Sequence, residues 1–204
     1  MHAAFATSHN PARIRWNEKY SQRGLDSLRD SPSNWLVKHE ELLRAQAKGW
    51  ALDLACGNGR NAIYLARLGF TVEALDLSDV AISWLAKKVR TQQLAVHPKL
   101  RDLESATLPA ARYQIILNFN YLQRSLFEQI SDALSPSGVL IFETMTRDHI
   151  EVLGREFNSK YLLDHNELLH AFSDLRVLHY RETVIIDKAS EKPKAVASLV
   201  ARKK

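Results

Sequence analysis

Residues 50–61 read Trp50-Ala-Leu-Asp-Leu-Ala-Cys-Gly-Asn-Gly-Arg-Asn61, and this stretch decides the fold. Trp50 to Leu54 is an apolar run that predicts a buried strand, and Asn58 to Leu68 carries apolar residues at helical spacing. Between the two, Gly57 and Gly59 allow the backbone to turn tightly and to approach a ligand closely. A glycine loop between a strand and a helix is typical of a binding site for a nucleoside-containing cofactor.

A second strand is expected after this helix, over residues 71–76, and it ends in Asp76. In dinucleotide-binding folds a carboxylate at this position accepts hydrogen bonds from the ribose hydroxyls. The start of the preceding helix offers unpaired backbone N–H groups to polar ligand atoms. Asp76 could instead be a carboxylate that only caps a helix or a loop. The ribose-binding role is favoured over this one, because the glycine loop precedes Asp76 at a suitable distance.

Strands and helices alternate along the chain on both sides of this core. We expect helices over residues 31–49, 78–89, 122–134 and 164–172. We expect further strands over residues 94–101, 113–118, 139–145, 175–180 and 195–201. The last two strands have no helix between them. This order predicts an α/β fold with a Rossmann-like doubly wound sheet, mostly parallel, with an antiparallel C-terminal hairpin strand.

The length of 204 residues suits a single domain over residues 1–204 with a sizeable core. Within it, residues 1–30 are interpreted as an arm that is flexible or folds over the cofactor site. Residues 146–163 lack clean periodicity and are interpreted as a substrate lid. No apolar run is long enough to span a bilayer. The single cysteine, Cys56, excludes an internal disulfide and fits a reducing compartment such as the cytoplasm.

Charge and histidine spacing argue against two other kinds of site. The net charge is +5, but the basic residues are scattered, with clusters only at Lys87-Lys-Val-Arg90 and Arg202-Lys-Lys204. A solvated helix face and a charged tail explain these clusters better than a nucleic-acid surface does. The eight histidines have no metal-ligand spacing and there is no cysteine pair, so no metal site is expected.

Several segments together carry a resemblance to a known family. They are Asp53-Leu-Ala-Cys-Gly-Asn-Gly-Arg-Asn61, Ala74-Leu-Asp76, Arg101-Asp-Leu-Glu104, Asn118-Phe-Asn-Tyr-Leu-Gln-Arg124, Leu134-Ser-Pro-Ser-Gly-Val-Leu-Ile-Phe-Glu-Thr144 and Leu199-Val-Ala-Arg-Lys203. Over roughly residues 13–204 the chain resembles class I S-adenosylmethionine-dependent methyltransferases. It is most similar to small bacterial methyltransferases of the tellurite-resistance-like type. The resemblance implies a seven-stranded fold and methyl transfer from S-adenosylmethionine, with S-adenosylhomocysteine as product, to a small molecule or an oxyanion.

The resemblance also implies a set of cofactor-binding residues. The set is Trp16, Tyr20, Asp53, Ala55, Cys56, Gly57, Gly59, Asn61, Asp76, Leu77, Asp102, Leu103 and Asn118. Asp76 would hold the ribose hydroxyls, and Asp102 would accept from the adenine amino group. Asn118 would end the fourth strand near the methionine and the transferred methyl. Trp16 and Tyr20 resemble the aromatic N-terminal segment that closes over the cofactor in this group.

Two positions depart from the family pattern. Ala55 replaces the first glycine of the loop and is expected to keep a negative φ. Ser137 stands where glycine is usual before the fifth strand. Cys56 is expected to be a small buried spacer and not a nucleophile.

No acid–base pair is evident, and the catalytic residues are unknown. Tyr121 and Arg124 are candidates that could face an anionic or small polar acceptor, although Arg124 could equally be a surface helix residue. His149 is expected to be a solvated loop histidine more than a base.

Other functions compete with this interpretation. Asn118-Phe-Asn-Tyr121 resembles the Asn-Pro-Pro-Tyr loop of amino-methyltransferases, which act on nucleic acids or proteins, but it lacks both prolines. Gly57-Asn-Gly-Arg-Asn-Ala62 also satisfies the fingerprint of nicotinamide-dependent dehydrogenases. Asp53 within the preceding strand and the absence of a separate substrate domain argue against that alternative. A third hypothesis is a module that binds the cofactor, or a nucleic acid, without catalysis.

Overall fold

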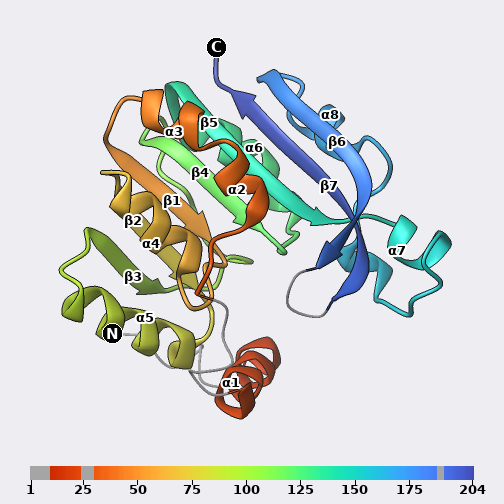
Figure 1. Cartoon of the computed structure of the whole chain (residues 1–204), viewed down its shortest axis with the longest axis horizontal. Helices are drawn as coiled ribbons and strands as arrows, with labels where there is room; N and C mark the ends of the chain where they lie inside the picture. The colour runs from red at the N-terminus through yellow and green to blue at the C-terminus, as the bar shows by residue number, and fades with distance from the viewer. Residues whose placement is uncertain (1–9, 24–29, 188–190) are drawn as a thin grey trace.

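The computed structural model describes residues 10–23, 30–187 and 191–204. One seven-stranded sheet lies at its centre, in the order β3-β2-β1-β4-β5-β7-β6 (Figure 1). The strands are β1 (Trp50–Leu54), β2 (Thr71–Asp76), β3 (Val96–Leu100), β4 (Tyr113–Phe119), β5 (Leu134–Met145), β6 (Arg176–Asp187) and β7 (Lys192–Arg202). The first five pair in parallel, and β7 is antiparallel to both β5 and β6. The predicted fold class is confirmed.

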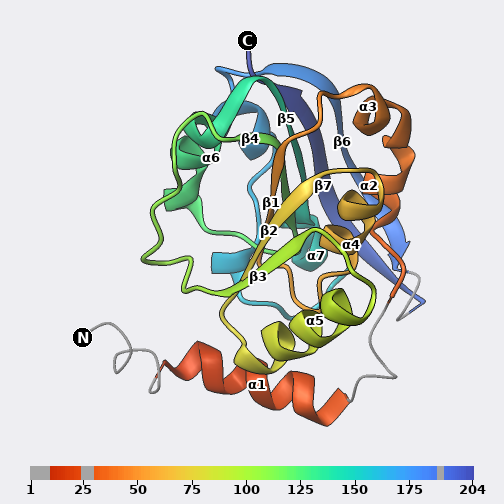
Figure 2. The same ribbon diagram turned by 90° about the vertical axis from the view of Figure 1, so that its left-hand side faces the viewer.

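Helices cover both faces of this sheet. They are α1 (Pro11–Arg23), α2 (Asn34–Lys38), α3 (Glu40–Ala45), α4 (Arg60–Arg67), α5 (Asp79–Thr91), α6 (Phe127–Ala133), α7 (Asp148–Glu151) and α8 (Glu167–Ala171), with 3-10 turns η2 (Arg124–Leu126) and η3 (Ser159–Tyr161). Figure 2 shows α6 on one side of the sheet and α2, α3 and α4 on the other. The helix predicted over residues 122–134 is in fact η2 followed by α6.

Neighbouring residues of the central strands enter two separate hydrophobic clusters. In β4, Ile116 is buried in one cluster with Ile130 of α6. Ile115 and Leu117, on either side of it, are buried in the other cluster with Leu65 of α4. This period of two places the core on both faces of the sheet, as expected for buried parallel strands.

The single helix predicted over residues 31–49 is wrong, because the structure has two short helices there. They are separated at His39, whose φ of −107° and ψ of 24° are not helical. After α3, the Lys48 ammonium donates to the carbonyl oxygens of Leu43 and Arg44 at 3.0 and 3.2 Å. This side chain satisfies terminal carbonyls that would otherwise lack partners.

The strand β5 begins earlier than the predicted strand 139–145. Its first residues form an irregular stretch in which Ser137 has a φ of +62° and the register with β4 shifts next to Tyr113. A Cβ on Gly138 would lie 2.8 Å from the carbonyl oxygens of Ser135 and Tyr113. The backbone approaches itself closely here, and only glycine fits.

The segment 146–163, predicted as a lid, is joined at its two ends. The amide of Arg147 donates to the carbonyl of Leu163 at 3.0 Å, and the amide of Leu163 donates to the carbonyl of Met145 at 2.9 Å. The helix α7 and the turn η3 lie between these ends. The segment therefore returns to the end of β5 from which it starts.

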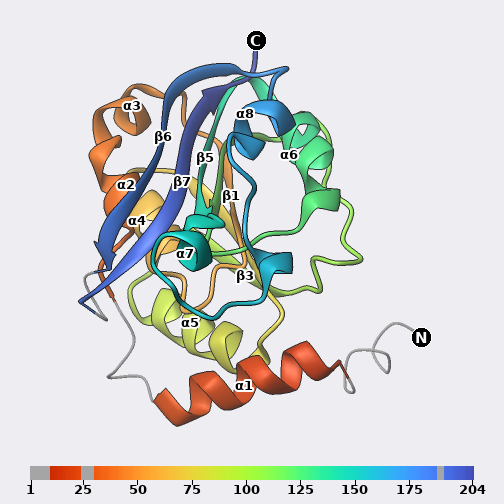
Figure 3. The same cartoon turned by 90° about the vertical axis from the view of Figure 1, so that its right-hand side faces the viewer.

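The N-terminal arm includes the helix α1, which lies against α5 (Figures 2 and 3). The rest of the predicted arm, residues 1–9 and 24–29, lies outside the described residues. Within the described ranges, no helix combines the length and apolar character needed to cross a membrane.

Candidate functional site

The predicted cofactor residues meet at the carboxyl ends of β1 to β4. Open α/β sheets bind ligands at this edge, where the strand order reverses. Here the reversal lies between β1 and β4, which flank each other although β2 and β3 intervene in the chain. The fold thus places the loop after β1, the end of β2 and the end of β4 at one switch point.

The loop after β1 has three residues in the left-handed region. Gly57 and Gly59 have φ of +57° and +75°, and Ala55 has φ of +51°. The expectation that Ala55 keeps a negative φ is therefore wrong. The turn from strand to helix requires the left-handed conformation at that position, and alanine carries roughly 1–2 kcal/mol of strain there. A Cβ at Gly57 would lie 2.5 Å from the Tyr20 hydroxyl, and one at Gly59 would lie 2.3 Å from a Leu85 methyl.

Asp53 fixes the helix that follows the loop. Its carboxylate is buried and accepts from the amide of Ala62 at 3.1 Å, in the first turn of α4. The N-cap residue Gly59 has no side chain to do this. Burial raises the pKa of Asp53 to about 7, against the attraction of Arg60. Asp53 therefore supports the loop from beneath.

Asp76 is held rigidly beside the loop. One of its oxygens accepts from the amide of Gly57 and the other from the amide of Ser78, both at 2.8 Å. The residue is 8% exposed, and burial raises the pKa of Asp76 although these two bonds oppose the shift. A carboxylate offers about four acceptor sites, so lone pairs remain for a ligand's hydroxyl groups. Leu77 beside it is half-buried.

Asp102 follows β3 at the same edge. One oxygen accepts from the amide of Glu104 at 3.0 Å, and the other accepts from the Asn10 side-chain amide at 2.9 Å. Leu103 is buried next to it. Asp102 therefore already accepts a hydrogen bond from the side-chain NH2 group of Asn10, which precedes α1. The adenine amino group is predicted to donate to Asp102 in the same way.

The helix α1 runs along the edge formed by these residues. Asn10 contacts Asp102 at its start, as described above. In its middle, Asn17 accepts from the Ser78 hydroxyl at 2.7 Å, and Arg13 pairs with Asp79 at 3.0 Å. The helix thus touches the ends of both β3 and β2.

The two aromatic residues of α1 differ in position. The ring of Tyr20 packs edge-on against Trp84 of α5 at 6.2 Å, and its hydroxyl lies over Gly57. Trp16 is 36% exposed, with its ring 6.1 Å from that of Tyr20 and the Lys19 ammonium above it. The structure therefore brings Tyr20 to the loop and leaves Trp16 at the outer face.

Cys56 and Asn61, two other residues of the predicted cofactor-binding set, are buried within the protein. Cys56 is a free thiol, and burial raises the pKa of Cys56 well above its ordinary value. This agrees with its expected role as a spacer. The Asn61 carboxamide oxygen accepts from the amide of Ser33 at 2.9 Å, which joins α4 to the residue before α2.

Asn118 and Tyr121 lie where β4 ends. The Asn118 amide donates to the carbonyl of Tyr121 at 2.7 Å, which closes a tight turn. Burial raises the pKa of the Tyr121 phenol, and the carboxylates of Glu104, Asp102 and Asp76 act in the same direction. Tyr121 therefore faces the cofactor edge as a neutral phenol.

Arg124 contacts the end of the segment 146–163 and the helix α8 that follows it. Its guanidinium pairs with Glu167 at 2.6 Å and donates to the carbonyl oxygens of Lys160 and Leu162 at 3.1 and 2.9 Å. Arg124 was predicted either to face the acceptor or to be a surface helix residue, and these contacts give it an anchoring role that neither prediction included.

His149 differs from its prediction. It was expected to be solvated, but it is 8% exposed and its ring packs edge-on against Phe157 at 5.6 Å. Burial lowers the pKa of His149, and the charges of Arg155 and Lys194 lower it further. The correction arises because the segment 146–163 folds back to the end of β5 and buries this side chain, which a sequence without periodicity does not reveal.

A cavity of about 260 Å³ lies between α2, the start of α4 and the β6–β7 hairpin. Four basic side chains line it, and none of them was predicted as a site residue: Lys38, Arg60, Arg181 and Lys194. They come from four separate segments, so no local motif in the sequence could identify them.

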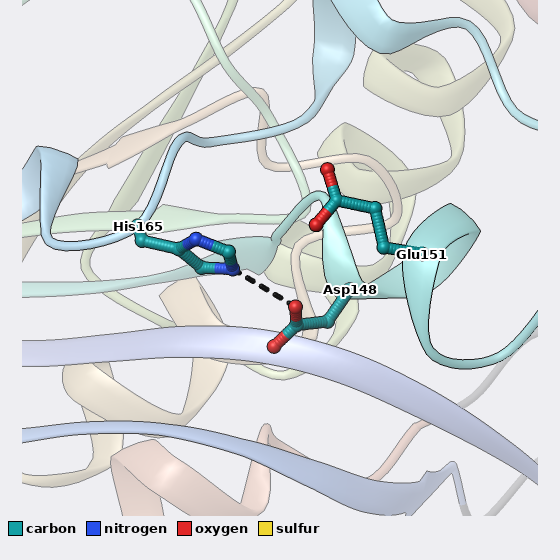
Figure 4. A group of neighbouring side chains, drawn as sticks. All are labelled: Asp148, Glu151 and His165. Carbon is teal, nitrogen blue, oxygen red and sulfur yellow. Dashed lines mark hydrogen bonds and ion pairs between the residues drawn. The ribbon is translucent and has the colours of Figure 1, made fainter.

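One group of possible metal ligands occurs among the described residues, at the base of the lid (Figure 4). Asp148, Glu151 and His165 place one ligand atom each within 4.8 Å of the others. His165 pairs with Asp148 at 2.9 Å, and this hydrogen bond raises the pKa of His165. Two of the three side chains are exposed, and a surface ion pair accounts for the arrangement.

Comparison with known proteins identifies the relatives of this chain. The family model described as tellurite resistance protein TehB matches residues 34–193. The probable S-adenosyl-L-methionine-dependent methyltransferase TehB of Haemophilus influenzae is 27% identical over 166 residues, which are 75% of this chain and 57% of that protein. The chain thus spans little more than half of that relative. The putative methyltransferase YqeM of Bacillus subtilis is 31% identical over 105 residues, 47% of this chain and 42% of that protein.

Solved structures show the same fold. The crystal structure of TehB from Haemophilus influenzae matches with a TM-score of 0.72 and 21% identity. The match covers 94% of this chain and 67% of that one.

Proposed function

This chain belongs to the tellurite resistance protein TehB family, and we propose that it transfers a methyl group from S-adenosylmethionine to a small-molecule or oxyanion acceptor. The methyltransferase names of its relatives and the class I methyltransferase fold support this activity. They favour methyl transfer over nicotinamide-dependent oxidation and over the nucleic-acid or protein alternatives.

The observation that carries the proposal is the geometry of Asp76 and the glycine loop. The Asp76 carboxylate is fixed by the amides of Gly57 and Ser78 and keeps lone pairs for two ribose hydroxyls. The loop beside it has no Cβ at Gly57 or Gly59 to block a ligand. These donors and acceptors fit S-adenosylmethionine, with Asp102 and Leu103 toward the adenine and Asn118 toward the methionine.

When bound, S-adenosylmethionine supplies a methyl group that its sulfonium already activates. The chain's own residues then have to orient the acceptor and exclude water. In this proposal α1 is the cofactor lid and residues 146–163 are the substrate lid, with Arg124 holding the far end of that segment. Residues 1–204 act as one domain, and the reduced Cys56 suits the cytoplasm.

Calorimetric titration with S-adenosylhomocysteine tests the proposal. The parent should bind with micromolar affinity, and Asp76→Ala should bind about 100-fold more weakly, a loss of about 2.7 kcal/mol. Asp132→Ala, which removes an exposed carboxylate on α6, is the matched control and should bind like the parent. A folded parent that does not bind S-adenosylhomocysteine would contradict the assignment.

A further inference from the structure

The basic cavity adjoins the proposed position of the transferred methyl. Arg60, which lines it, is the residue after Gly59 of the cofactor loop. Asn120, which also lines it, is two residues beyond Asn118, so their Cα atoms are at most about 7 Å apart. A ligand in this cavity would therefore lie next to the carboxyl ends of β1 and β4.

The charge of the cavity favours an anion. Among the described residues that line it, four cationic side chains stand against two carboxylates, Glu143 and Asp187, an excess of two positive charges. Glu143 is already bound by the Ser198 hydroxyl at 2.7 Å and by Arg181 at 3.3 Å. Lys38 makes no ion pair with the described residues, and its ammonium lies 5.5 Å above the Trp35 ring. Donors therefore remain for a ligand's oxygens.

The shape of the cavity favours an organic molecule over a bare inorganic ion. A volume of 260 Å³ is several times that of one water, about 30 Å³, and approaches the lower end of small-molecule pockets, about 300 Å³. Part of its wall is apolar, formed by Pro32, Trp35, Ile185 and Ile186. Ile186 is 62% exposed, so its side chain is accessible to the apolar body of a ligand.

We propose that this cavity receives the methyl acceptor and that the acceptor is an organic anion, with an apolar body and a carboxylate, phosphate or sulfonate group. The inference rests on the proposed function for the transfer step. In that step an acceptor lone pair forms the new bond to the methyl carbon while the carbon–sulfur bond breaks. The electron pair of that bond stays on the sulfur, and a proton on the attacking atom leaves to water.

The anionic dye 8-anilinonaphthalene-1-sulfonate tests the recognition, first with the free protein and then with S-adenosylhomocysteine in excess. Its fluorescence should report one saturable site that weakens about fivefold to tenfold in Lys38→Gln and in Arg181→Gln. Arg176→Gln removes an exposed arginine from the same strand as Arg181 but outside the cavity, and it should leave the dye affinity unchanged. The uncharged analogue N-phenyl-1-naphthylamine should bind all four proteins equally.

Three results would overturn the proposal. They are the absence of a single dye site in the parent, a dye affinity in both cavity variants that equals the parent's, and displacement of the dye by micromolar selenite. Displacement by selenite would show that the cavity binds an inorganic oxyanion that has no organic body. The S-adenosylhomocysteine titration is independent, because a failure of cofactor binding would leave the dye contrast intact and would contradict only the methyl-transfer step.

Discussion

The cofactor side and the acceptor side of the sheet edge are built in opposite ways. On the cofactor side, the predicted loop and carboxylate contacts lie within a few residues of a strand end, as Gly57, Asp76 and Asp102 do. On the acceptor side, the cavity takes Lys38 and Arg181 from segments that are far apart in the chain. A short motif can therefore specify the cofactor, whereas acceptor specificity depends on the whole fold and can change without disturbing the cofactor loop.

The cofactor loop and the segment 146–163 also differ in how tightly their backbone is packed, and glycine substitutions test this difference with the largest expected effect. Gly59 and Gly154 both have positive φ, +75° and +60°. A Cβ at Gly59 would collide with the buried Leu85 side chain, but nothing lies within 4 Å of a Cβ at Gly154, in the lid. We expect Gly154→Ala to lower the free energy of unfolding by about 1 kcal/mol and Gly59→Ala by about 3 kcal/mol.

Urea unfolding of the two variants measures the contrast. Since both substitutions carry the same backbone strain, the difference between them isolates the collision with Leu85. Equal losses would mean that Leu85 moves aside, and that the cofactor loop is no more tightly packed than the lid.

Asp53 provides the next largest effect, because the cofactor side buries a carboxylate beneath its loop. Its pKa is raised to about 7 in the folded state, so the folded protein holds the proton more tightly than the unfolded chain does. Stability should then fall as the pH rises from about 4 to about 7. Relative to Asp53→Asn, the parent should lose about 2–3 kcal/mol between pH 5 and pH 8.

Urea unfolding at both pH values checks this, with Asp53→Asn as the reference. The asparagine oxygen can still accept from the Ala62 amide, so the helix start is kept. Asp76 is present in both proteins, so the burial that raises the pKa of Asp76 acts in both. Its charge also raises the pKa of Asp53, and this coupling is part of the measured difference. A parent and a variant with parallel pH profiles would show that Asp53 is ionised without penalty.

Particular residues show why the sequence predicts one side better than the other. The loop and Asp76 are predictable because a strand, a turn and a helix follow one another locally. The left-handed φ of Ala55 is not, because alanine normally avoids it and only the completed turn imposes it. The burial of His149 depends on a lid that folds back onto β5. The pairing of Arg181 with Glu143 depends on the register of the terminal strands, which residue patterns alone do not fix.

The helix α1 offers the smallest expected effect. Its contacts described above are with the cofactor side, at Asp102, Ser78 and Asp79. Asn17→Ala removes the acceptor for the Ser78 hydroxyl and loosens the helix. If α1 is the cofactor lid, S-adenosylhomocysteine should dissociate about tenfold faster, equivalent to about 1.4 kcal/mol. Stopped-flow fluorescence measures this rate, and Arg15→Ala, an exposed residue of the same helix, is the control.

The opposite outcome for α1 would be equally informative. The Asn10 amide already donates to Asp102, and the Tyr20 hydroxyl already lies over Gly57, so the helix contacts two residues proposed to bind the cofactor. Tighter binding by Asn17→Ala would mean that α1 competes with the cofactor and must open before it binds. In either case the dye affinity of the basic cavity should stay unchanged, because none of the described residues of α1 lines the cavity. A change in dye affinity would show that the cofactor and acceptor sides are coupled.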